Sequence, residues 1–179
     1  MKPIASLRHI RNPYTRRMLS NVIGKDPLNV LASTPARLRR LVGRLNEKQL
    51  RTPLAKGKWS IIQIVTHLAD VEVVLAFRIR IALAQSGSPL QAMDQDRWAS
   101  GLHYDKANLK RKLDLFAAVR GDHIRLFRSL KTDEWKRYGM HQERGKETVE
   151  HIVRLYAGHD INHLKQIEMI RKSARNIKL

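Results

Sequence analysis

The segment WSIIQIVTHLADVEVVLAFRIRIALAQ, residues 59–85, is apolar at nearly every position and contains neither glycine nor proline. Its β-branched residues would suit a strand locally, but its length and its lack of turn residues favour a single helix. A helix that is apolar on almost every side must be surrounded by other parts of the protein. We therefore predict that residues 59–85 form the most buried helix of a helical domain.

Three other segments show the apolar spacing of amphipathic helices and would pack against this one. The segment at about 34–46 has Ser33 or Thr34 as its cap and Pro35 at its first helical position. The segment at about 105–130 is capped by Asp105. The sequence shows no convincing strand pattern, and residues 86–104 form a long irregular connection between the second and third helices of the chain. We predict an all-α protein folded as an antiparallel four-helix bundle, with the three outer helices at about 34–46, 105–130 and 148–173.

The 179 residues are enough for one domain with a substantial core. We assign residues 1–25 to a basic N-terminal extension, with a short helix near 14–22, and residues 26–175 to the bundle. No apolar run reaches the length of about 18 residues that a membrane span needs, and the N-terminus lacks the apolar core of a secretory signal. The chain has no cysteine, which excludes disulfides, zinc–thiolate sites and a cysteine nucleophile. We expect a soluble cytoplasmic protein.

The chain is strongly basic, with 35 lysines and arginines, 16 acidic residues and a formal net charge of +19. The excess is greatest at the two ends, and the acidic residues within positions 1–58 are only Asp26 and Glu47. Such a balance is typical of proteins that bind polyanions, and also of an ordinary solvated basic surface. No helix-turn-helix, zinc-finger or RNA-binding motif accompanies it, so weak polyanion binding stays an alternative.

Two histidines four residues apart, His159 and His163, lie within the apolar stripe of the last predicted helix. At this spacing two side chains share one helix face, about 6 Å apart, so both imidazoles can reach one metal ion. His67 lies in the apolar segment 59–85, where a buried imidazole needs partners for both ring nitrogens, and it is the strongest candidate for a third ligand. Position 160 is aspartate, so the H-E-x-x-H motif of zinc proteases is absent. The ordinary alternative is that the three are unrelated histidines.

Three further residues are candidates for a catalytic or supporting role. Asp70 follows His67 by one turn, and is either a residue that orients a ligand ring or a solvated charge. Glu72 would pair with an arginine across the bundle, Arg120 or Arg125, or act as a base. His141 precedes the last helix in a loop, where it would line the mouth of the site or be a surface histidine.

Several short motifs in a fixed order resemble the DinB/YfiT-like superfamily. They are GKWSIIQIVTHLADVE and, after a long gap, HQERGKETVEHIVRLYAGHDINHLKQI. The stretches GKDPLNVLASTPARLRRLV and DQDRWA also look like parts of this group, so the resemblance covers about residues 24–170. The residues that carry it are Trp59, Ser60, His67, Leu68, Ala69, Asp70, Glu72, Gly145, Gly158, His159, Asp160, His163, Leu164, Gln166 and Ile167.

The resemblance implies a four-helix bundle in which three histidines hold a divalent metal ion, Zn²⁺, Ni²⁺ or Fe²⁺. Carried over to this sequence they are His67, His159 and His163, the residues that the spacing also favours. Three protein ligands leave a coordination position for water or substrate. Such an ion can lower the pKa of a bound water to near 7 for hydrolysis, or bind a thiol as thiolate. The superfamily includes members that resemble low-molecular-weight-thiol S-transferases.

We therefore expect a metal-dependent enzyme, either a thiol S-transferase or a hydrolase, that acts on a small-molecule substrate. A transferase would take its thiol from a low-molecular-weight cosubstrate, because the chain has no cysteine. Two alternatives stay open: a basic module that binds nucleic acid or another polyanion, and a catalytically silent bundle in which the metal only joins helices. A homodimer would be consistent with the apolar positions in residues 1–33.

Overall fold

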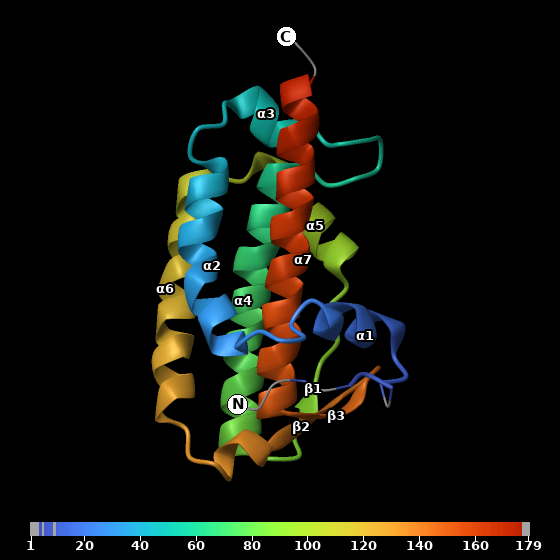
Figure 1. Cartoon of the computed structure of the whole chain (residues 1–179), viewed down its shortest axis with the longest axis vertical. Helices are drawn as coiled ribbons and strands as arrows, with labels where there is room; N and C mark the ends of the chain where they lie inside the picture. The colour runs from blue at the N-terminus through green and yellow to red at the C-terminus, as the bar shows by residue number, and fades with distance from the viewer. Residues whose placement is uncertain (1–3, 5, 9, 177–179) are drawn as a thin grey trace.

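The computed structural model describes residues 4, 6–8 and 10–176, so residues 1–3, 5 and 9 of the predicted basic extension lie outside the described part. Each long helix contacts two others, in the cyclic order α2, α6, α4, α7. The predicted four-helix bundle is confirmed, together with the long connection between its second and third helices. The four helices run along the longest axis of the molecule (Figure 1): α2 (Pro27–Val42), α4 (Ile61–Ala84), α6 (Leu109–Ser129) and α7 (Val149–Asn176).

Helix α4 is the apolar helix that the sequence predicts to be the most buried. Fifteen of its 24 residues are buried, because its apolar side chains cover nearly the whole circumference. It begins with a capping box in which the Ser60 backbone N–H donates to the Gln63 side chain at 2.9 Å. This cap satisfies a backbone donor that the first turn would otherwise leave unpaired.

The apolar core is divided into two clusters along the length of the bundle. On α7, for example, the first cluster ends at Ile161 and the second begins at Leu164. Each long helix places at least one buried polar residue between the segments that it gives to the two clusters. The bundle therefore has a polar layer near its middle, whose members include Thr34, Asp70, Arg120 and His163.

Helix α2 begins earlier than predicted. Asp26 caps it and Pro27 occupies the first helical position, while Pro35 lies inside the helix, so the predicted start at Pro35 is wrong. A proline inside a helix has no N–H for the carbonyl four residues earlier. Here that carbonyl belongs to Leu31, and it accepts a hydrogen bond of 3.0 Å from Arg120 Nη1 on α6 instead. The bundle thus satisfies the carbonyl that Pro35 leaves unpaired.

Helix α6 begins later than predicted, at Leu109. Its cap is Asn108, whose side-chain oxygen accepts the Arg111 N–H at 3.0 Å, and not Asp105. Asp105 lies in a separate 3₁₀ turn just before the helix. The smaller helical elements are α3 (Glu47–Arg51), α5 (Gln95–Gly101), η1 (Tyr104–Lys106) and η2 (Glu134–Lys136).

A small three-stranded sheet lies beside the bundle near one of its ends (Figure 1). Strand β2 (Tyr138–His141) is central, pairing in parallel with β1 (Pro89–Leu90) and antiparallel with β3 (Gly145–Thr148). The sequence shows no convincing strand pattern, so this small sheet was not predicted. The strands have two to four residues each, which is too few to show an alternating pattern in the sequence.

A short helix, α1 (Pro13–Ser20), lies across α7 and is the helix predicted within the basic extension. Gly158 allows the two backbones to approach, because a Cβ at this position would lie 1.9 Å from the Met18 carbonyl oxygen. The Asn21 side-chain amide donates to the Gly158 carbonyl at 3.2 Å beside this contact. The division into residues 1–25 and 26–175 stays a prediction. Within the described residues, no helix is long and apolar enough to cross a membrane.

Candidate metal centre

Three imidazole rings meet where α4 faces α7. His67 comes from α4, and His159 and His163 lie one turn apart on α7. The Nε2 atom of His159 lies 3.1 Å from Nε2 of His67 and 3.0 Å from Nε2 of His163. All three side chains are buried. The predicted convergence of the rings is therefore present, whereas their binding of a metal stays a prediction.

The donor set and its spacing fit a divalent metal ion. Within the described residues, the three histidines form a group whose ligand atoms all lie within 4.8 Å of one another. Metal–imidazole bonds of about 2.0–2.1 Å at tetrahedral angles place the ligand nitrogens about 3.3 Å apart. The observed contacts of 3.0 and 3.1 Å differ from this by a few tenths of an ångström. The donor set and these two contacts therefore fit such an ion, and the ligand atoms of the remaining pair, His67 and His163, lie within 4.8 Å of each other.

The surrounding side chains orient His163 and His67. The Nδ1 atom of His163 lies 2.7 Å from the Gln166 side-chain oxygen, which accepts a hydrogen bond from the Nδ1–H, so the lone pair of the ring lies on Nε2. The Trp59 ring packs on the His67 ring with 4.8 Å between centroids. The Nδ1 atoms of His67 and His159 are buried and find no hydrogen-bond partner among the described residues.

Burial keeps the three imidazoles neutral. Burial, followed by the proximity of His163, lowers the pKa of His67 to about 3. Burial is also the main cause that lowers the pKa of His163 to about 4, and the nearby Arg17 cation adds to it. The pKa of His159 is well below its usual value, again mainly through burial. Neutral imidazole is the form that binds metal ions, so the site is ready to accept one at neutral pH.

Two of the candidate catalytic residues lie elsewhere. Asp70 is buried and accepts a hydrogen bond from Lys112 Nζ at 2.7 Å, so it is not a solvated charge. Among the described residues, no hydrogen bond joins it to the three histidine rings. His141 lies on β2, is 3% exposed and is therefore not a surface histidine. Its Nδ1 accepts the Glu143 N–H at 3.2 Å, and burial lowers its pKa to about 4.

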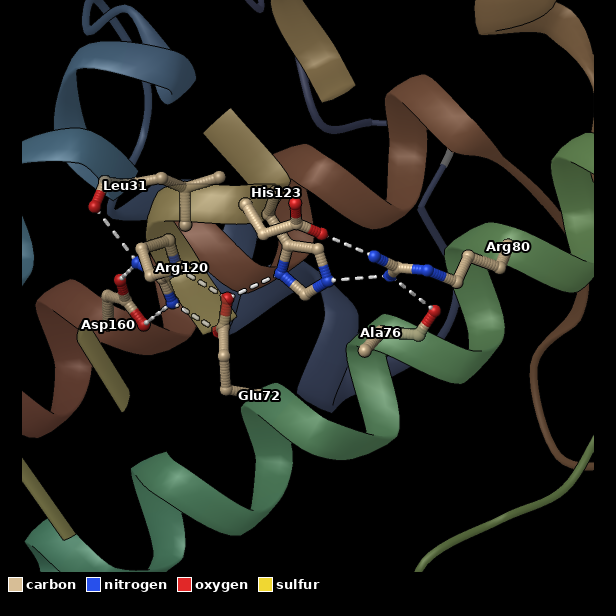
Figure 2. A network of polar contacts seen from close by, with 8 residues as sticks. Leu31, Glu72, Ala76, Arg80, Arg120, His123 and Asp160 are labelled. Atoms are coloured by element: carbon tan, nitrogen blue, oxygen red, sulfur yellow. Dashed lines mark hydrogen bonds and ion pairs between the residues drawn. The ribbon is translucent and has the colours of Figure 1, made fainter. Parts of the chain in front are cut away.

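The third candidate, Glu72, belongs to a buried ionic network (Figure 2). Its two carboxylate oxygens accept hydrogen bonds of 2.7 and 2.6 Å from Arg120. Arg120 also donates to Asp160 at 2.6 Å. Burial alone would raise the pKa of Glu72, but Arg120 and His123 hold it below its usual value. The predicted pairing of Glu72 with an arginine is confirmed for Arg120, whereas Arg125 pairs with Asp122.

His123, for which no role was predicted, lies next to Glu72. Its Nδ1 lies 2.6 Å from Glu72 Oε1, and its Nε2 lies 3.3 Å from Arg80 Nη1. Because an arginine can only donate, the Nε2 of His123 is an acceptor. Its Nδ1 therefore carries the ring proton and donates a hydrogen bond to Glu72. His123 thus supports the ionic network and not the three-histidine cluster (Figure 2). The only sequence signal for this position was its place in the apolar stripe of α6.

Two adjoining cavities reach the histidine cluster. One has a volume of about 430 Å³ and is lined by His163 and Trp59, and the other has about 280 Å³ and is lined by His67 and Arg78. These volumes suit small molecules. The two cavities share four lining residues, two of which come from α1: Tyr14, Arg17, Gln95 and His159.

Comparisons with known proteins agree with this architecture. Residues 31–167 match the DinB superfamily. A relative from Oceanobacillus iheyensis is 27% identical over 86% of this chain and 89% of its own length. YfiT of Bacillus subtilis is 29% identical over 78% of this chain and 79% of its own. The names of both relatives contain the words "metal-dependent hydrolase".

Two solved structures share the fold. That of YfiT from Bacillus subtilis, described as having an unusual four-helix bundle topology, superposes with a TM-score of 0.78 at 24% identity, covering 97% of this chain and 93% of YfiT. The mycothiol-dependent maleylpyruvate isomerase superposes with a TM-score of 0.55 at 12% identity, covering 79% of this chain and 56% of the isomerase.

Proposed function

The chain belongs to the DinB superfamily, and from this we propose that it is a metal-dependent enzyme in which His67, His159 and His163 hold one divalent cation. The observation that carries the proposal is the meeting of three buried Nε2 atoms, with contacts of 3.0 and 3.1 Å. Imidazole donors suit Zn²⁺, Ni²⁺ and Fe²⁺ alike, so the proposal covers all three ions.

Hydrolysis of a small-molecule substrate is the reaction that we propose first. A divalent cation with three protein ligands and an open position lowers the pKa of a bound water to near 7 and polarises a substrate carbonyl or phosphoryl oxygen. The names of the two relatives support this reaction class.

The residues of this chain prepare the site for such a reaction. Gln166 holds the proton of His163 on Nδ1, which fixes the ring and directs its lone pair into the cluster. The Trp59 ring covers one side of His67 and keeps bulk water from it. The two cavities beside His159 provide room for a substrate next to the cluster.

Thiol transfer is the second candidate reaction. The shared fold with the maleylpyruvate isomerase favours it, because that protein is described as mycothiol-dependent. The first cavity, of about 430 Å³, would then have to admit both the thiol and an electrophile. A catalytically silent bundle with a structural metal is the remaining alternative.

Metal content tests the proposal. Protein dialysed against a chelator and then incubated with Zn²⁺, Ni²⁺ or Fe²⁺ should retain about one ion per chain, measured by elemental analysis after gel filtration. His163→Ala should lose most of this ion, since it removes one of three ligands. His103→Asn, which changes an exposed histidine outside the cluster, is the matched control and should keep the ion. A wild-type protein that stays metal-free after all three incubations overturns the proposal.

Activity assays separate the candidate reactions. Metal-loaded protein should hydrolyse activated esters or amides, or conjugate a low-molecular-weight thiol to an electrophile, and His163→Ala should do neither. Metal-loaded protein without either activity would favour the structural role. Polyanion binding, a homodimer and a cytoplasmic location stay predictions from the sequence. Salt-dependent binding to duplex DNA is the measurement for the first of them.

A further inference from the structure

Two arginines that pair with no carboxylate of the described residues line the second cavity beside the histidine cluster. The wall of this cavity contains Arg17 from α1 and Arg78 from α4, together with His67 and His159. Neither arginine takes part in an ion pair with any described carboxylate, although ion pairs are frequent in this protein. We propose that Arg17 and Arg78 form a subsite for a small oxyanion, a carboxylate or phosphate group, on the substrate of the proposed enzyme.

Arg78 is held in place but keeps one donor unused. The residue is 6% exposed, and burying a guanidinium without a counter-charge is costly. Its Nη1 donates to the Tyr156 hydroxyl at 3.1 Å and its Nη2 donates to the Gln91 carbonyl. Its Nε has no hydrogen-bond partner among the described residues. Neutral acceptors thus orient the guanidinium but do not neutralise it, so an anion in the cavity would supply the missing charge.

Tyr156 links this arginine to the histidine cluster. It lies one turn before His159 on α7, and the two rings have 6.3 Å between their centroids. The same hydroxyl that accepts from Arg78 therefore belongs to a ring beside the candidate metal centre. An anionic group held at Arg78 would place the neighbouring part of its molecule close to His67 and His159.

Arg17 contributes a second, more exposed cation. It lines both cavities, and α1 carries it to the cluster because Gly158 allows close packing. A third arginine of the second cavity, Arg144, is already paired with Glu147 at 2.6 Å. Glu143 also lines this cavity but is exposed. The balance of charge on the wall therefore favours an anion, and Arg17 gives part of the basic N-terminal segment a specific role.

The size of the cavity limits the ligand. About 280 Å³ suits a molecule of a few carbon atoms with one or two charged groups rather than a polymer. The inference rests on the proposed function for its location at an active site, but the binding of an anion to the arginines does not require a metal. The two can therefore be tested apart.

The experiment is an NMR titration of ¹⁵N-labelled protein, freed of metal by dialysis, at low ionic strength. The probes are succinate and inorganic phosphate, with neutral succinamide as the matched control ligand. Wild-type protein should bind at least one of the two anions more tightly than succinamide, with shifts at the Arg78 Nε–H. Arg17→Gln and Arg78→Gln should each weaken binding by about tenfold or more. Arg40→Gln, an exposed arginine that does not line the cavity, should leave it unchanged.

The outcomes distinguish the two proposals. Binding of succinate alone or phosphate alone supports the subsite and identifies which oxyanion it prefers. Equal binding of succinate and succinamide, or anion binding that survives Arg17→Gln, overturns it. The Arg17→Gln variant keeps this test valid if Arg78→Gln fails to fold. Arginine-dependent anion binding by a protein that takes up no Zn²⁺ would uphold the subsite and reject the metal-dependent function.

Discussion

At the scale of single residues, the buried histidine cluster lowers the free energy of unfolding at low pH. The folded-state pKa values of His67 and His163 are about 3 and about 4, below the value of about 6.5 for an exposed imidazole. Between these limits the unfolded chain binds more protons than the folded chain, so the free energy of unfolding must fall as the pH falls. Above about pH 6.5 both states are neutral and this contribution is constant.

We predict that the metal-free protein loses stability between about pH 6.5 and pH 4, by about 1.4 kcal/mol per pH unit for each buried histidine. His67→Gln should make this slope shallower by about that amount, measured by urea unfolding at several pH values. Trp59 packs on the same ring but does not titrate. The control Trp59→Phe should therefore lower the stability at every pH and leave its slope against pH unchanged. A slope that is the same in the wild type and His67→Gln would contradict the prediction.

The three histidines of the cluster could be predicted from the sequence because their positions within two helices indicate that they are buried on faces that can meet. His159 and His163 are four apart on one helix face, and His67 interrupts an apolar helix. Arg78 and Tyr156 could not be selected, because their importance arises from a contact between α4 and α7. No periodicity within one helix reports which residue of another helix lies opposite.

At the scale of elements, the position of α1 depends on the absence of a side chain at Gly158. A Cβ there would lie 1.9 Å from the backbone oxygen of Met18, so Gly158→Ala must displace α1. We predict a loss of stability of about 1–3 kcal/mol and faster hydrogen exchange at Met18 and Leu19, both now buried against the bundle. Because α1 carries Arg17, the variant should also weaken anion binding.

A matched control for this variant is Gly121→Ala in α6, where a Cβ would meet no atom within 4 Å. Alanine favours the helix over glycine by about 1 kcal/mol, so this variant should be neutral or slightly stabilised. Unchanged exchange at Met18 in Gly158→Ala would show that α1 does not need the close approach.

The long helices were predictable and the precise ends of two were not. Apolar periodicity over many residues indicated each helix, whereas Pro35 and Asp105 suggested starts that the structure places at Pro27 and Leu109. Proline is tolerated inside α2 because another helix satisfies the carbonyl it leaves free. The sheet was missed because its strands have only two to four residues, and because β1 pairs with residues of β2 that lie 51 positions away along the chain.

At the scale of the whole molecule, one guanidinium joins all four long helices. Arg120 of α6 donates to Glu72 of α4, to Asp160 of α7 and to the Leu31 carbonyl of α2. The ions are almost completely buried, so each depends on the others for its counter-charge (Figure 2). Arg120 lies between the segments that α6 gives to the two apolar clusters, and its bonds to the other three helices restrict their sliding along one another.

Arg120→Met should therefore destabilise the entire bundle, because it leaves two buried carboxylates without a cation. Breaking such a pair typically costs about 3–5 kcal/mol, which should appear as one cooperative shift of the urea midpoint with an unchanged slope. The control is Arg125→Met on the same helix. The exposed guanidinium of Arg125 pairs with Asp122 at 3.4 Å, so its loss should lower the stability by no more than about 1 kcal/mol. If the two variants unfolded at the same urea concentration, the network would contribute nothing specific to the packing of the four helices. A large loss of stability in Arg120→Met, with little change in Arg125→Met, would instead show that the buried ionic network stabilises the four-helix arrangement that positions the three histidines.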